Sequence, residues 1–225
     1  MAQDTLTIDS TKKNTVYLFS GLGVDERVFR NLDLHDYDTV HIRWIIPQKN
    51  EAIEEYAKRI SQQIKTENPI LIGLSFGGMM AIEVAKIIDT EKIILISSAK
   101  IKTEIPWYFR LAGTTRIHRV LPDFILTRSN AMLNWFFGVQ SPEEKLLLKT
   151  ILLESDPDFN RWGIDKIVTW RNTFIPGNLT HIHGTSDRIL PFRYVESDFM
   201  IERGGHFMTL NKATEISVIL KKLLN

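Results

Sequence analysis

The sequence predicts an α/β protein with a mostly parallel six-stranded sheet, helices on both faces and an inserted helical cap. Short apolar runs rich in β-branched residues alternate with stretches of helical periodicity. Such runs are typical of strands buried on both faces, and their alternation with helices is typical of a parallel sheet. The alternation stops near residue 100 and resumes near residue 179, and only helical patterns lie between these points.

Six apolar runs give the expected strands, which span residues 15–19, 38–42, 69–72, 92–96, 179–183 and 198–202. Helices are expected between and after them, at about residues 25–32, 51–65, 79–88 and 211–225. Asn50 stands before the second of these helices, and asparagine commonly caps a helix N-terminus.

The helical cap is expected at about residues 101–172, inside a single domain of residues 1–225. Ser141, Pro142 and two following glutamates form a typical helix start, and another helix is expected after Pro157. Four of the five tryptophans lie in this insert. They fit an apolar substrate pocket, and they equally fit the packing of helices against a sheet.

The composition excludes several kinds of site and partner. Without cysteine the chain has no thiolate nucleophile, disulfide or thiolate metal site. Its 28 basic and 27 acidic residues nearly balance, so no nucleic-acid partner is expected. No signal-peptide pattern and no apolar run of membrane-spanning length occur, so we expect a cytoplasmic protein without a membrane span. The composition leaves the oligomeric state open.

A G-x-S-x-G motif, formed by Gly73, Ser75 and Gly77, lies between an expected strand and an expected helix. A serine on such a sharp turn has a strained backbone and an exposed hydroxyl. Larger side chains at the two flanking positions would crowd the turn, and glycine avoids this. The helix dipole favours the negative charge that develops during nucleophilic attack. The motif therefore predicts Ser75 as a catalytic nucleophile.

Three more motifs lie at the carboxyl ends of expected strands, where sites form in parallel sheets. They read SGLG at residues 20–23, HIHGTSDRILP at 181–191 and GGHF at 204–207. Together with the serine motif they resemble the oxyanion loop, the acid-bearing loop and the histidine loop of the α/β-hydrolase superfamily, in the order of that family. The resemblance covers nearly the whole chain and implies a catalytic triad of Ser75, Asp187 and His206.

Each residue of this triad has a role in acyl transfer. His206 accepts the proton of the serine hydroxyl, and Asp187 holds the imidazole tautomer and stabilises the imidazolium. The tetrahedral intermediate carries an oxyanion, which the backbone N–H groups of Leu22 and Phe76 are expected to bind.

The chain departs from the family pattern in three places. Ser20 stands where many members have histidine, and the two first strands of the family have no room before residue 15. Only 19 positions separate Asp187 from His206, so a loop is expected before the last strand in place of the usual helix.

The expected function is that of a serine hydrolase that cleaves a small carboxylic ester or thioester through an acyl-enzyme, without cofactor or metal. One alternative is a ligand receptor or signalling partner that keeps the triad and turns over slowly. Others are a carbon–carbon hydrolase, peptidase, lyase or haloperoxidase, because the pocket and not the fold sets the reaction. His181 and His183 share a strand face, but no third metal ligand is evident, so structural roles are expected.

The candidate substrate-binding residues are aromatic or basic, and they are Trp107, Tyr108, Arg110, Trp135 and Phe207. Between residues 102 and 128 the insert carries an excess of basic residues, which are Lys102, Arg110, Arg116, Arg119 and Arg128 against Glu104 and Asp123. This excess fits the binding of an anionic acyl group, and it also fits an ordinary solvated helix face.

Overall fold

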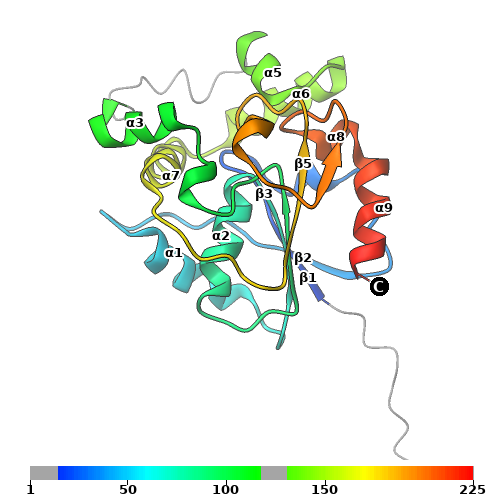
Figure 1. Ribbon diagram of the computed structural model, residues 1–225, viewed down its shortest axis with the longest axis horizontal. Helices are drawn as coiled ribbons and strands as arrows, with labels where there is room; N and C mark the ends of the chain where they lie inside the picture. Colours follow the sequence, from blue (N-terminus) through cyan, green and yellow to red (C-terminus); the bar gives the residue numbers. More distant parts are fainter. Residues whose placement is uncertain (1–14, 118–130, 225) are drawn as a thin grey trace, which may run out of the picture.

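The computed structural model describes residues 15–117 and 131–224 (Figure 1). Its six strands form one sheet in the order β2-β1-β3-β4-β5-β6, and every neighbouring pair is parallel. The strands are β1 (Thr15–Phe19), β2 (Asp38–His41), β3 (Ile70–Leu74), β4 (Lys92–Ile96), β5 (Leu179–Gly184) and β6 (Phe199–Ile201). The expected six-stranded parallel sheet is confirmed.

Helices cover both faces of this sheet, which is why its central strands are apolar at successive positions. α1 (Ile53–Ile60) and α2 (Phe76–Ala85) lie on one face, and α9 (Ala213–Leu224) lies on the other (Figure 1). Alternate residues of β4 divide between the two cores: Ile93 and Leu95 pack toward α1 and α2, and Ile94 and Ile96 pack toward α9. The short helix α8 (Met208–Asn211) precedes α9.

The start of α1 differs from the sequence-based expectation. The helix begins at Ile53, with Ala52 at the N-cap position and no side-chain cap. The carboxylate of Glu55 instead accepts the N–H of Ala52 at 3.4 Å. Asn50 has φ of 59°, which places it in the left-handed region two residues earlier, so its expected capping role is wrong.

Between β4 and β5 the described residues form four α-helices and no strand. These helices are α3 (Trp107–Thr115), α5 (Ala131–Phe137), α6 (Pro142–Glu154) and α7 (Pro157–Thr169). The expected start of α6 is confirmed, because Ser141 Oγ accepts the N–H of Glu144 at 3.2 Å. α7 begins with an equivalent cap, in which Asp156 Oδ1 accepts the N–H groups of Asp158 and Phe159.

The 3-10 helix η1 (Glu26–Phe29) is shorter than the helix expected at about residues 25–32, and a second 3-10 segment, η5 (Phe192–Tyr194), follows β5. η5 is the only helical segment between β5 and β6 in the described chain, so the expected loop between these strands is confirmed. No helix in the described ranges is both long and apolar enough to cross a bilayer.

Candidate active site

Ser75 is the single residue between β3 and α2, and its backbone is strained. Its φ of 54° and ψ of −121° lie in a region that non-glycine residues rarely adopt, at a cost on the order of 1–3 kcal/mol. Neighbouring groups hold this geometry. The N–H of Ser75 donates to the Ile96 carbonyl at 2.9 Å, and its own carbonyl accepts from Ser98 Oγ at 2.6 Å and from the Gly78 N–H at 2.9 Å.

Gly77 brings the start of α2 against the end of β1. A Cβ atom on Gly77 would lie 2.2 Å from the Phe19 carbonyl oxygen and 2.3 Å from that of Ser20, which is closer than atoms pack. The glycine is therefore required by a close approach of two backbones. This approach puts Ser75 beside the loop that follows β1.

Ser75, His206 and Asp187 form one hydrogen-bonded chain. The Ser75 hydroxyl lies 2.8 Å from His206 Nε2, and His206 Nδ1 lies 2.7 Å from Asp187 Oδ2. His206 is 1% exposed and Asp187 is 4% exposed, so the bond between them is shielded from water. The three residues follow the carboxyl ends of three different strands, β3, β5 and β6, as the sequence predicts for a parallel α/β protein.

The other oxygen of Asp187 is held by its own loop. Oδ1 accepts the N–H groups of Ile189 and Leu190, each at 2.9 Å. With Oδ1 occupied, Oδ2 is left to accept the Nδ1–H of His206. This assigns the tautomer in which Nε2 carries no proton and faces the hydroxyl of Ser75.

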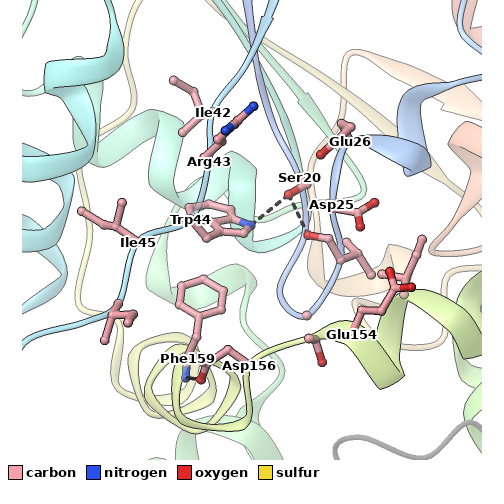
Figure 2. Close-up of a pocket in the computed structure, with 15 residues that line it drawn as sticks. Ser20, Asp25, Glu26, Ile42, Arg43, Trp44, Ile45, Glu154, Asp156 and Phe159 are labelled. Carbon is pink, nitrogen blue, oxygen red and sulfur yellow. Dashed lines mark hydrogen bonds between the residues drawn. The ribbon is translucent and has the colours of Figure 1, made fainter.

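The loop of residues 20–24, here called the oxyanion loop, is fixed by hydrogen bonds within and around it. Ser20 Oγ donates to the Val24 carbonyl at 2.8 Å and accepts from Trp44 Nε1 at 2.9 Å (Figure 2). Ser20, which departs from the family pattern, thus ties the two ends of the loop together. The backbone N–H groups of Leu22 and Phe76 take part in no hydrogen bond within the described ranges.

A pocket of about 330 Å³ opens beside the oxyanion loop (Figure 2). Trp44 and Phe159 form an apolar wall, and the carboxylates of Asp25, Glu154 and Asp156 lie around it. None of the triad residues lines this pocket. The pocket therefore lies beside Ser75 without including it.

His181 and His183 lie behind the triad and are fully buried. His183 Nε2 lies 2.8 Å from the Leu190 carbonyl and 3.7 Å from Asp187 Oδ2, while its Nδ1 lies 3.3 Å from His181 Nε2. Burial lowers the pKa of His181 to about 3, and the adjacent His183 adds to this effect. Burial also lowers the pKa of His183, although the charge of Asp187 opposes it. The described residues contain no group of three potential metal ligands.

Among known proteins, the chain resembles solved structures, whereas its sequence matches neither a family model nor a curated protein. Solved structures do match along nearly the whole chain. A hydrolase from Pseudomonas aeruginosa is 12% identical, covers 96% of this chain and 91% of its own, and superposes with a TM-score of 0.73. The chain has the α/β-hydrolase fold.

Two further structures illustrate the range of proteins with this fold. A thermophilic esterase from Thermogutta terrifontis, solved with malate bound, is 18% identical over 94% of this chain and 89% of its own, with a TM-score of 0.66. A bromoperoxidase from Bacillus anthracis is also 18% identical, over 94% of this chain and 92% of its own, with a TM-score of 0.65. At such identities the likeness shows the α/β-hydrolase fold, and the reaction has to come from the site.

The five candidate substrate residues lie in different surroundings. Trp107 is 57% exposed and Trp135 is 54% exposed, and the guanidinium of Arg188 stacks over the Trp135 ring at 4.4 Å. Arg110 is exposed on α3, and Tyr108 beside it is partly buried, which raises the pKa of its hydroxyl. Of the basic excess in the insert, Arg119, Arg128 and the acidic Asp123 lie outside the described residues.

Phe207 lies in the hydrophobic core, so its expected role as a substrate-binding residue is wrong. It is 1% exposed, and its ring packs 4.6 Å from that of Phe137. A ring buried in this way offers no surface to a substrate. It supports the neighbouring His206 ring from behind, at a centroid distance of 6.2 Å.

Sequence reasoning missed several residues around the site. Ser98 holds the carbonyl of Ser75, and Trp44 holds Ser20. For Ser98 a signal was present, because polar residues directly after a buried strand lie at the carboxyl edge of the sheet. Trp44 gives no such signal, since its partner is set by how the chain after β2 folds back.

Proposed function

We propose that this protein is a serine hydrolase that cleaves carboxylic esters or thioesters through an acyl-enzyme. The observation that carries this proposal is the continuous hydrogen-bonded chain from Ser75 through His206 to Asp187, with Ser75 on a strained turn. The strained turn holds the hydroxyl in place for attack, and the buried carboxylate orients the imidazole that accepts its proton.

In the proposed first step, Ser75 Oγ attacks the substrate carbonyl carbon while its proton passes to His206 Nε2. The resulting imidazolium is stabilised by Asp187 Oδ2. The carbonyl oxygen becomes an oxyanion and accepts the free N–H groups of Leu22 and Phe76. Each donor of this kind contributes about 3 kcal/mol to lowering the barrier.

Collapse of the tetrahedral intermediate breaks the bond to the alcohol or thiol, which takes the proton from His206. Water then attacks the acyl-enzyme with His206 as base, and a second tetrahedral intermediate releases the acid and restores Ser75. All groups required for these steps come from the chain itself. The proposal therefore includes no cofactor and no metal.

A labelling experiment tests this function. A fluorophosphonate probe is expected to modify Ser75, and Ser75→Ala is expected to abolish both labelling and turnover of p-nitrophenyl esters or acyl-CoA thioesters of graded chain length. Ser186→Ala is the matched control, because Ser186 is an exposed serine beside Asp187 at the same edge of the sheet. Labelling at another serine would contradict the nucleophile.

The substrate panel separates the alternatives. Fast turnover of one class of ester or thioester supports the hydrolase. Tight binding with almost no turnover would indicate a receptor, and peroxide-dependent halogenation without hydrolysis would indicate haloperoxidase chemistry.

A further inference from the structure

Helix α7 of the insert lies directly on the oxyanion loop, and a glycine makes this contact close. A Cβ atom on Gly163 would lie 2.2 Å from Leu22 Cδ1. The side chain of Leu22 therefore occupies the space that any larger residue at position 163 would fill. Leu22 is one of the two residues whose backbone N–H groups we propose as oxyanion donors.

Asn160 makes a second contact one helical turn earlier. It is 4% exposed, and its Nδ2 donates to Ser155 Oγ at 2.9 Å. Its Oδ1 lies 2.9 Å from the place where a Cβ on Gly23 would stand, so the amide lies against the loop backbone at that residue. Gly23 has φ of 70°, the left-handed region that the loop needs in order to turn there.

The same helix also contacts Phe76, the source of the second free N–H. The rings of Phe159 and Trp162 meet the Phe76 ring edge-on, with centroids 6.3 and 6.0 Å away. Phe159, Trp162 and Gly163 are spaced three and four residues apart, so they share one face of α7. One helix face thus contacts both residues that would supply the oxyanion donors.

α7 is itself fixed to the body of the protein. Trp162 Nε1 donates to the Glu51 carbonyl at 3.0 Å, and Trp170 Nε1 donates to Glu83 Oε1 on α2 at 2.8 Å. The Trp162 ring also packs 4.4 Å from that of Tyr56 on α1. These contacts attach α7 to the elements that cover the sheet, and not only to other parts of the insert.

We propose that Gly163 and Asn160 are positioning residues, which set the place of the Leu22 N–H relative to the Phe76 N–H. This inference rests on the proposed hydrolase function. Oxyanion donors act in the transition state, so a displaced donor lowers kcat and leaves ground-state binding unchanged. Residues that only pack the core would change stability without this split between kcat and KM.

Gly163→Ala tests the proposal directly. The added methyl collides with Leu22 Cδ1, and a displacement that moves the Leu22 N–H by as much as an ångström lowers the rate by up to about 100-fold. We expect kcat for a p-nitrophenyl ester to fall about 10- to 100-fold with KM changed less than about twofold. In a Leu22→Ala background the same Gly163→Ala change is expected to lower kcat by less than about threefold, because the space for the methyl is then empty.

Two further variants complete the design. Asn160→Ala removes the contact at Gly23 and is expected to lower kcat with the same unchanged KM, which keeps the proposal testable if Gly163→Ala does not fold. Val168→Ala is the control on the same helix, since Val168 packs against Gly113 of α3. It is expected to lower the melting temperature with kcat unchanged.

The outcomes separate this inference from the proposed function. If wild-type protein is labelled at Ser75 and turns over ester, but folded Gly163→Ala and Asn160→Ala keep full kcat, the positioning role is wrong and the hydrolase stands. Equal losses from Gly163→Ala in the wild-type and Leu22→Ala backgrounds would likewise overturn the contact with Leu22. If wild-type protein shows neither labelling nor turnover, the hydrolase proposal fails, and the positioning role fails with it.

Discussion

At the scale of single residues, the carboxylate of Asp187 divides its two oxygens between different partners. Oδ1 accepts two backbone N–H groups of its own loop, and Oδ2 accepts the Nδ1–H of His206. An amide in this place has one acceptor oxygen, which the two loop N–H groups would occupy. Its NH₂ group would then face His206 Nδ1 and favour the tautomer that carries the proton on Nε2.

Asp187→Asn is therefore expected to lower kcat for ester hydrolysis by about four orders of magnitude while the fold is kept. Steady-state kinetics measure the rate, and circular dichroism checks the fold. Asp156→Asn is the comparison, because Asp156 caps α7, whereas the ring of His206 contacts Asp187 and Ser75. A larger loss of activity in that variant would mean that the acid is wrongly assigned.

The buried His181 links pH to stability. Its pKa is about 3 in the folded protein, whereas an exposed histidine titrates near 6.5. Between these values the unfolded chain binds a proton that the folded protein does not, so the free energy of unfolding falls as the pH falls. Each such histidine contributes a slope of at most about 1.4 kcal/mol per pH unit.

His181→Gln is expected to flatten this dependence in urea unfolding between pH 4 and 6. His35→Gln serves as the control, because His35 is exposed. The same slope in wild type and His181→Gln would show that the histidine is protonated inside the fold.

At the scale of secondary-structure elements, the end of α7 is joined to α2 through a buried polar contact. Glu83 is 1% exposed, and its Oε1 accepts both Trp170 Nε1 at 2.8 Å and Lys86 Nζ at 2.7 Å. A buried carboxylate that loses a donor keeps the cost of its desolvation. This contact holds α7, the helix that packs against the oxyanion loop, in place.

Trp170→Phe is expected to lower the free energy of unfolding by about 1–3 kcal/mol, because the ring is largely kept while the donor is lost. Trp107→Phe is the matched control on α3, where the tryptophan is 57% exposed, and a change within about 0.5 kcal/mol is expected. Chemical denaturation measures both. Equal changes in the free energy of unfolding would show that the hydrogen bond from Trp170 to Glu83 does not stabilise the protein.

At the scale of the whole molecule, the site is assembled from segments far apart in the sequence, since Ser75 and His206 are 131 positions apart. The nearly neutral charge of the chain contrasts with the basic excess in the insert. Of this excess, the described Arg110 and Arg116 are both exposed, at the middle and at the end of α3. We propose that they attract the anionic end of a substrate, and exposed charges limit the effect to roughly 1 kcal/mol.

Arg110→Ala is accordingly expected to raise KM about two- to fivefold for a dicarboxylate monoester and to leave KM unchanged for a neutral ester of equal size. Added salt should erode the difference in wild type. Lys221→Ala, on α9, is the control for net charge. Equal KM values for the charged and the neutral ester would leave Arg110 as an ordinary solvated side chain.

The strands of the sheet and the three triad candidates could be predicted from local sequence patterns. Buried strands and amphipathic helices leave periodic patterns within ten or so residues, and the turn at Ser75 leaves its glycines beside it. The order of the serine, acid and histidine motifs then indicated that Asp187 and His206 belong with Ser75. The structure places the three side chains within hydrogen-bonding distance of one another.

The contacts around these three residues could not be predicted from the sequence, because they depend on how the elements pack. The contact of Gly163 with Leu22, the hydrogen bond from Ser98 to Ser75, and the burial of Phe207 each join segments that no local pattern relates. Even the local prediction at Asn50 was wrong, because the start of α1 depends on where the preceding turn directs the chain. Periodicity reports which face of an element is apolar, whereas the partner of a given side chain is set by how whole elements pack.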